Sequence, residues 1–192
     1  MFLSSKILPR LMKAAFKGPG LRIGMVEGGL YLAQPNNWEV LLLKNSLGNK
    51  IKSTVIELHG QFPRPGEVLQ IRKGEAAYPV PQPPLLKERL GLARQGAVST
   101  KVILYLRGDE YWLFQGEEHE IVMIRREHLD LIDCTEIDYD IEGEPVGPSY
   151  QDIGEGIFYR NATGILYIHS VLPPELPLVE AMKNINFEED EL

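Results

Sequence analysis

Cysteine is nearly absent from this chain, whose 192 residues include one, Cys134. A single cysteine excludes a disulfide within the chain, and this usage is typical of proteins from a reducing compartment. Long apolar runs are also missing, since none approaches the ~18–20 residues that a membrane-spanning helix needs. Pro9, Arg10 and Lys13 interrupt the first residues, so no secretory signal is expected there. The sequence therefore predicts a cytoplasmic protein, or a virion component that is assembled in a cytoplasm.

The sequence also lacks the local signatures of the common enzyme classes. It contains no phosphate-binding G-x-x-x-x-G-K-[ST] loop, no G-x-S-x-G nucleophile elbow and no H-E-x-x-H zinc motif. Its four histidines stand at positions 59, 119, 128 and 169 without the spacing of a common zinc site, so each is interpreted as structural. We therefore expect a protein that is not an enzyme and that carries no cofactor.

Acidic residues are scarce in the first half of the chain and abundant in the second. Residues 1–96 contain fourteen Lys or Arg and six Glu, whereas residues 97–192 contain six Lys or Arg and 21 Asp or Glu. The halves thus carry +8 and −15, which gives the net charge of −7, and the first Asp is Asp109. Such a division predicts docking between a basic and an acidic surface, within one molecule or between molecules.

What is present is a globular composition broken by frequent turns, with 44% hydrophobic residues, 14 Pro and 18 Gly. Turn residues separate short runs of β-forming residues, which predicts a mainly β fold. We expect antiparallel sheets in a barrel-like or sandwich-like arrangement with about three short α-helices; an α+β fold is the alternative. The expected strands are 21–26, 30–34, 39–44, 50–59, 68–72, 101–106, 111–114, 120–125, 132–142, 156–159 and 164–169.

Four segments are expected along the chain. Residues 1–20 form a basic amphipathic helix, and residues 21–73 form a β-rich subdomain. Residues 74–96 form a Pro-rich linker with a short helix, and residues 97–192 form an acidic β-rich subdomain with a C-terminal helix and tail. The two subdomains can share one core. In the first, the run from Val40 to Leu43 is apolar on both faces, which predicts a strand at the centre of a sheet.

The main functional candidate is the helix expected between Pro9 and Gly18. At 100° per residue its apolar residues share one side and its basic residues the other. Because two helical turns are not stable alone, the apolar side must dock on the protein's own core, a partner or a lipid surface. The predicted partner-binding residues are Lys6, Arg10, Lys13, Lys17 and Arg22. An acidic protein surface suits them, and no specific nucleic acid is expected, since aromatic residues are not interleaved with them.

A run of alternating acids gives a second candidate. In the strand expected over 132–142, Asp138, Asp140 and Glu142 share one face. Oxygen ligands on one face suit Mg²⁺ or Ca²⁺, although the same alternation is typical of a solvated sheet face. The sequence predicts no metal site, and these three carboxylates are the candidates that a metal-dependent enzyme would use.

Together these features favour a non-catalytic structural or assembly subunit of a larger complex, such as a phage virion or tail. Its basic N-terminal helix would dock on protein subunits, either copies of itself or neighbouring components. Two alternatives stay open. One is a peripheral accessory protein whose N-terminal helix meets an anionic membrane surface, and the other is a small metal-dependent enzyme.

Overall fold

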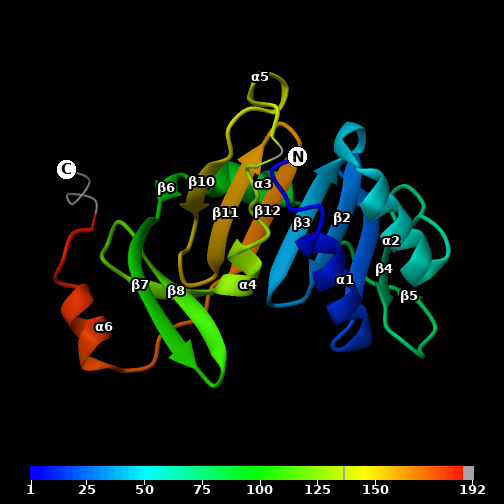
Figure 1. Cartoon of the computed structure of the whole chain (residues 1–192). Coiled ribbons are helices and arrows are strands. Elements are labelled where there is room, and N and C mark those ends of the chain that lie inside the picture. Colours follow the sequence, from blue (N-terminus) through cyan, green and yellow to red (C-terminus); the bar gives the residue numbers. More distant parts are fainter. Residues whose placement is uncertain (136, 188–192) are drawn as a thin grey trace.

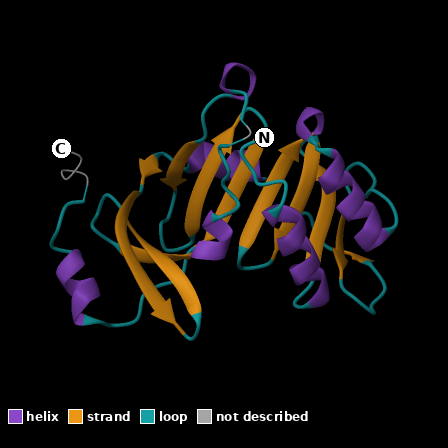
Figure 2. Cartoon of the chain, in the orientation of Figure 1, coloured by secondary structure: helices purple, strands orange, loops and turns teal. Residues whose placement is uncertain are grey.

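The computed structural model describes residues 1–135 and 137–187, and it has the expected mainly β fold. The described strands form two antiparallel sheets (Figures 1 and 2). The larger sheet has nine strands in the order β5-β4-β1-β2-β3-β12-β11-β10-β6, and the smaller has three in the order β7-β8-β9. Both sheets are open and both contribute to one hydrophobic core. Within the described residues neither sheet closes into a barrel.

Short connections join most of the elements. The strands of the larger sheet are β1 (Leu21–Val26), β2 (Gly29–Gln34), β3 (Trp38–Leu43), β4 (Val68–Ile71), β5 (Tyr78–Pro79), β6 (Gln95–Gly96), β10 (Val146–Tyr150), β11 (Gly156–Asn161) and β12 (Gly164–His169). The smaller sheet contains β7 (Val98–Leu106), β8 (Asp109–Gln115) and β9 (Ile121–Arg125). The α-helices are α1 (Ile7–Lys17), α2 (Asn49–His59), α3 (Leu86–Leu92), α4 (Arg126–Leu129), α5 (Tyr139–Glu142) and α6 (Pro177–Met182).

The apolar strand β3 lies at the centre of the larger sheet, as its composition predicts. It is the fifth of nine strands, and its residues from Trp38 to Leu42 are buried. It pairs with β2 on one side and with β12 on the other. Because β12 comes from the acidic half of the chain, the strands of the two expected subdomains lie in one continuous sheet.

Two glycines allow the neighbouring strands to approach β3 closely. A Cβ atom on Gly29 of β2 would lie within 3.0 Å of the carbonyl oxygen of Leu42, and one on Gly164 of β12 would lie equally close to that of Leu41. Real Cβ atoms essentially never come so near to another heavy atom. Any side chain at either position would therefore have to push the central strands apart.

Gly29→Ala and Gly164→Ala are each expected to lower the free energy of unfolding by about 2 kcal/mol, because the added methyl group must displace the backbone of β3. Gly91→Ala is the matched control, since a Cβ at this exposed position of α3 meets nothing within 4 Å. It should raise stability by up to about 1 kcal/mol through the better helix propensity of alanine. Urea unfolding followed by circular dichroism measures all three values. Strand variants as stable as the wild type would contradict the close approach.

The two faces of the larger sheet are covered by different helices (Figure 1). On one face α1 and α2 contact each other, and α1 also contacts β1 and β2. The apolar side of α1 is buried there through Leu8, Leu11, Met12 and Ala15. The opposite face is covered by α3, whose Leu86 is buried in a separate apolar cluster with Tyr31, Phe158 and Tyr167. The Pro-rich run that precedes α3 in the chain starts in β5, which pairs with β4 at the edge of the sheet.

The smaller sheet packs its two faces on different clusters. Phe114, Val122 and Ile124 point into the core of the larger sheet. Leu113, Ile121 and Met123 point the other way and pack against α6, where Val179 and Met182 are buried. Leu178, the residue before Val179 in this helix, is instead 48% exposed.

The strand predicted over 50–59 is wrong, because these residues form the helix α2. Its β-branched residues Ile51, Thr54 and Val55 favour a strand by propensity, but they are the buried residues of this helix, and their spacing of three and four matches one helix face. Gly60 then ends the helix in the left-handed conformation, with φ of 87°. Burial of one face against the core decides the structure here.

The strand predicted over 132–142 is also wrong within the described residues, and Glu136 lies outside them. Ile132 makes a single bridge to Leu3, and Tyr139–Glu142 form the short helix α5. Asp133 accepts hydrogen bonds from the backbone and hydroxyl of Thr135, and Asp138 accepts one from the backbone of Asp140. Such local side-chain bonds compete with the hydrogen bonds of a sheet, which explains the difference.

Candidate functional site

Four of the five predicted partner-binding residues lie on or beside α1. Arg10 and Lys17 are exposed on the helix side that faces away from the core, and Lys6 is exposed just before the helix. Lys13 forms an ion pair with Glu57 of α2 at 2.7 Å. Since α2 adds the exposed Lys50 and Lys52, the two helices carry the basic residues Arg10, Lys13, Lys17, Lys50 and Lys52, which we call the α1–α2 basic surface.

Arg22, the fifth predicted residue, lies on the other side of the sheet. In β1 the alternate residues Leu21 and Ile23 point into the core beneath α1, so Arg22 points to the face covered by α3. Its Nε donates a hydrogen bond to the side-chain oxygen of Gln70 at 3.4 Å. The structure therefore separates Arg22 from the α1–α2 basic surface.

Ion pairs between the basic and acidic halves are rare in the structure. Within the described residues, no Lys or Arg of 1–96 lies within 4.0 Å of an acid of 97–192. The N-terminal amine of Met1, which pairs with Glu142, makes the one crossing contact between fully charged groups in this part of the chain. Hydrogen bonds from Thr135 lower the pKa of Asp133, and the charge of Lys6 adds to this at longer range. The charge division of the sequence thus persists in the folded molecule.

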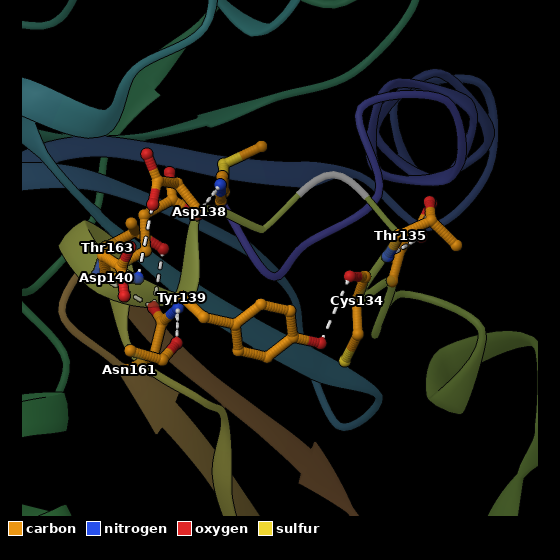
Figure 3. A network of polar contacts seen from close by, with 11 residues as sticks. Cys134, Thr135, Asp138, Tyr139, Asp140, Asn161 and Thr163 are labelled. Carbon is orange, nitrogen blue, oxygen red and sulfur yellow. Dashed lines mark hydrogen bonds and ion pairs between the residues drawn. The ribbon is translucent and has the colours of Figure 1, made fainter.

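The three candidate metal ligands lie together in sequence but do not form a site. Asp138 and Asp140 are exposed around α5, where Asp138 caps the helix, and Glu142 pairs with the N-terminal amine. Figure 3 shows this segment, with the Tyr139 hydroxyl directed at the carbonyl of Cys134. Among the described residues no three His, Cys, Asp or Glu side chains gather as metal ligands would. The Asp138 carboxylate caps α5, and that of Glu142 pairs with the N-terminal amine.

The apolar side of α1 is buried in the core, so it does not face solvent or a lipid surface. In the described part of the chain, no helix has the length and apolar character to span a membrane. Contact between α1 and an anionic membrane would therefore have to use its basic residues alone.

A second candidate site surrounds Glu39, a residue that the sequence analysis did not single out. Glu39 projects from β3 onto the face covered by α3, where it is 8% exposed. The Tyr31 hydroxyl and the Arg89 guanidinium each donate a hydrogen bond to its carboxylate at 2.8 Å, and His169 Nε2 lies 3.3 Å from it. Burial alone would raise the pKa of Glu39, but the bonds from His169 and Arg89 hold it at about 2. The carboxylate is therefore ionised at neutral pH.

Arg89 is itself held from several directions. Its guanidinium carbon lies 4.1 Å from the centre of the Tyr167 ring and 5.7 Å from that of Phe158, which are cation–π distances. The carboxylate of Glu27 accepts hydrogen bonds from the backbone N–H groups of Leu86 and Lys87 at the start of α3. These contacts fix α3, and with it Arg89, above the sheet.

The order of the strands creates a row of side chains under α3. Arg22, Ala33, Glu39, Tyr167 and Phe158 occupy adjacent positions of β1, β2, β3, β12 and β11. Since all five point to one face, the small side chain of Ala33 leaves a hollow between Arg22 and Glu39. A pocket of ≈ 240 Å³ occupies this hollow. It is lined by Arg22, Tyr31, Ala33, Pro35, Asn36, Glu39, Pro83, Pro84, Arg89 and His169.

A second pocket of ≈ 550 Å³ adjoins the first and extends to Glu155 and Ser170. It shares five lining residues with the first pocket, namely Asn36, Glu39, Pro84, Arg89 and His169. Burial raises the pKa of Tyr167, which lines it, to about 12, so its hydroxyl is neutral. The Glu39 cluster thus contributes residues to both of these adjoining pockets.

One feature of the sequence points to this cluster. Glu39 is the single charge in an otherwise apolar central strand, and a buried carboxylate requires partners. The partners come from distant segments, namely Tyr31, Arg89 and His169, and only the order of the strands brings them together. His169, which we expected to be structural, belongs to this cluster, and its side chain is 26% exposed and lines the pockets.

Comparison with known proteins gives no relative. No protein-family model matches the sequence, and neither a curated protein nor a solved structure matches it significantly. The proposals that follow therefore rest on the geometry and charge of this chain.

Proposed function

We propose that the protein is a non-catalytic assembly subunit, which docks its α1–α2 basic surface on the acidic surface of another copy of the chain. The observation that carries this proposal is the absence, within the described residues, of any ion pair between Lys or Arg of 1–96 and the acids of 97–192. Each molecule therefore presents both charge sets to its surroundings. Unlike patches on one chain dock head to tail and build rings or open filaments, as in a phage tail.

The basic surface suits such a contact because the apolar side chains of α1 are already buried within the subunit. α1 is fixed by its buried side, so its outer side meets a partner as a rigid array. Glu57 is the acid paired within this surface, where it neutralises Lys13. The acidic half offers exposed carboxylates on turns around both sheets, among them Glu117, Glu118 and Glu144. Charge complementarity of this kind sets orientation and raises the rate of association.

The first test is the dependence of self-association on salt. Sedimentation velocity of the purified protein should show concentration-dependent association at about 50 mM NaCl and its loss at about 500 mM, where the screening length falls to about 4 Å. We expect the apparent dissociation constant to rise by about tenfold or more between the two conditions. A protein that stays monomeric at low salt, or that associates equally at both salt concentrations, would overturn the proposal.

The second test reverses charges at matched positions. The triple variant Arg10→Glu, Lys13→Glu and Lys17→Glu should remain monomeric at low salt while its circular dichroism stays that of the wild type. The control triple variant is Arg64→Glu, Arg94→Glu and Arg160→Glu, three exposed residues outside α1 and α2 that change the net charge by the same amount. Association that is lost in both variants would show an effect of net charge alone, and would contradict docking through α1.

A further inference from the structure

We propose that the hollow above Ala33 binds a small organic carboxylate, whose anionic group pairs with Arg22. This inference concerns the sheet face opposite the α1–α2 basic surface and does not depend on the proposed assembly. Its basis is a preformed pocket with a guanidinium that has no acidic partner among residues 1–135 and 137–187, next to a carboxylate that is paired within the protein.

Arg22 is the unbalanced charge of this pocket. Among the described residues its side chain contacts the neutral side chain of Gln70, and no acid lies within 4.0 Å of its guanidinium. The Arg22 side chain is only partly exposed, so water solvates its charge incompletely. A guanidinium presents its N–H groups in a planar fork that matches a carboxylate, and such bidentate pairs are among the strong polar contacts in proteins. Arg22 is therefore placed to bind an anion.

Glu39 is not the acidic partner of Arg22, because the two residues lie two strands apart. Ala33 separates the two residues in the row, and neighbouring strands are about 4.8 Å apart, so the two backbones are about 10 Å apart. The Glu39 carboxylate turns instead to Tyr31, Arg89 and His169. It remains ionised, and its charge disfavours a phosphate dianion in the same pocket more than a carboxylate monoanion.

The walls indicate a small ligand with an apolar body. Pro35, Pro83 and Pro84 line the pocket, and proline rings are rigid, so little order has to be imposed on binding. The ring of Tyr31 is buried at the base, with its hydroxyl committed to Glu39. The volume of ≈ 240 Å³ lies below the range of about 300–1,000 Å³ typical of drug-sized ligands. A short aliphatic or single-ring acid fits these properties.

The test compares acids with their uncharged amides. Sodium butyrate and sodium benzoate are titrated into ¹⁵N-labelled full-length protein at pH 7, with butyramide, benzamide and inorganic phosphate as separate arms. We expect one of the acids to shift the backbone N–H signals of β1, β2 and β3 in a saturable way. The dissociation constants of the corresponding uncharged amide ligand and of phosphate should be about tenfold or more above that of the acid. Equal binding of an acid and its amide, stronger binding of phosphate, or no saturation by either acid would overturn the proposal.

Two variants locate the binding and one controls for charge. Arg22→Gln should raise the dissociation constant by about tenfold or more, and Ala33→Val should do the same by filling the hollow. Arg160→Gln removes one arginine from the same sheet face outside the pocket, and it should bind as the wild type does. Binding that survives both pocket variants, or that is lost in the control, would contradict the site. Self-association is measured on the same samples, so that failure of the assembly proposal is recognised separately.

Discussion

Glu39→Gln is expected to lower the free energy of unfolding by about 3 kcal/mol at pH 7, because it leaves the guanidinium of Arg89 partly buried without its counter-charge. The depressed pKa of Glu39 gives a similar figure, since a fall from 4.5 to about 2 corresponds to about 3 kcal/mol. Urea unfolding at equilibrium measures the change. A loss below about 1 kcal/mol would show that the cluster contributes little more than a surface ion pair.

The pH dependence and a double variant distinguish the ion pair from a packing effect. A carboxyl group whose pKa is depressed by folding stabilises the protein above the pKa of the unfolded chain, and this contribution disappears as the pH falls through the folded value. The difference between wild type and Glu39→Gln should therefore be constant above about pH 5 and roughly halved by pH 3. Adding Arg89→Met to Glu39→Gln should cost less than the sum of the two single variants, by about 2 kcal/mol. Additive losses would contradict direct coupling.

Mild acid is expected to destabilise the protein through His128, and His128→Leu should remove most of this effect. His128 is 3% exposed in α4, and burial, followed by the charges of Arg125 and His169, lowers its pKa from 6.5 to about 3. The ring is neutral at pH 7, so the Glu127 oxygen at 3.6 Å is not an ion-pair partner there. Below pH 6.5 the unfolded chain takes up a proton that the folded protein excludes, so stability falls with pH.

The expected size follows from proton linkage. Each pH unit between about 6 and 3 costs about 1.4 kcal/mol, so the wild type should lose about 2 kcal/mol between pH 7.5 and pH 5 from this group alone. His128→Leu is compared with the wild type at both pH values by urea unfolding, and the value at pH 7.5 corrects for the changed packing. A variant that loses as much stability as the wild type between these pH values would show that the acid sensitivity lies elsewhere.

Local patterns predicted much of the fold because the information for hairpins is local. The hairpin of β7 and β8 follows the strands expected over 101–106 and 111–114, and that of β11 and β12 follows those expected over 156–159 and 164–169. The segment over 50–59 failed because propensity is weak information when a helix buries one face. Strand order was beyond reach, since nothing local in β3 indicates that its second neighbour is β12.

The candidate sites differ in the same way. The basic side of α1 follows from the spacing of residues within one helix, so the sequence predicted four of its residues correctly as neighbours on or beside that helix. Arg22 was grouped with them by proximity in sequence, whereas alternation in β1 turns it to the other sheet face. The Glu39 cluster gathers residues from β2, β3, α3 and β12, and their meeting depends on the order of the strands.

The pairing of β3 with β12 has a consequence for synthesis of the chain. Leu41 and Leu42 can pair with Ile165 and Gly164 only after those residues leave the ribosome, about 120 residues later. At about 5–20 residues per second, the central strand β3 spends roughly 6–24 s with one edge uncovered. During that interval the unpaired backbone N–H and C=O groups of β3 can form hydrogen bonds with a strand of another chain. Chaperone capture, or prompt occupation of that edge by another chain, would then decide the yield of folded protein.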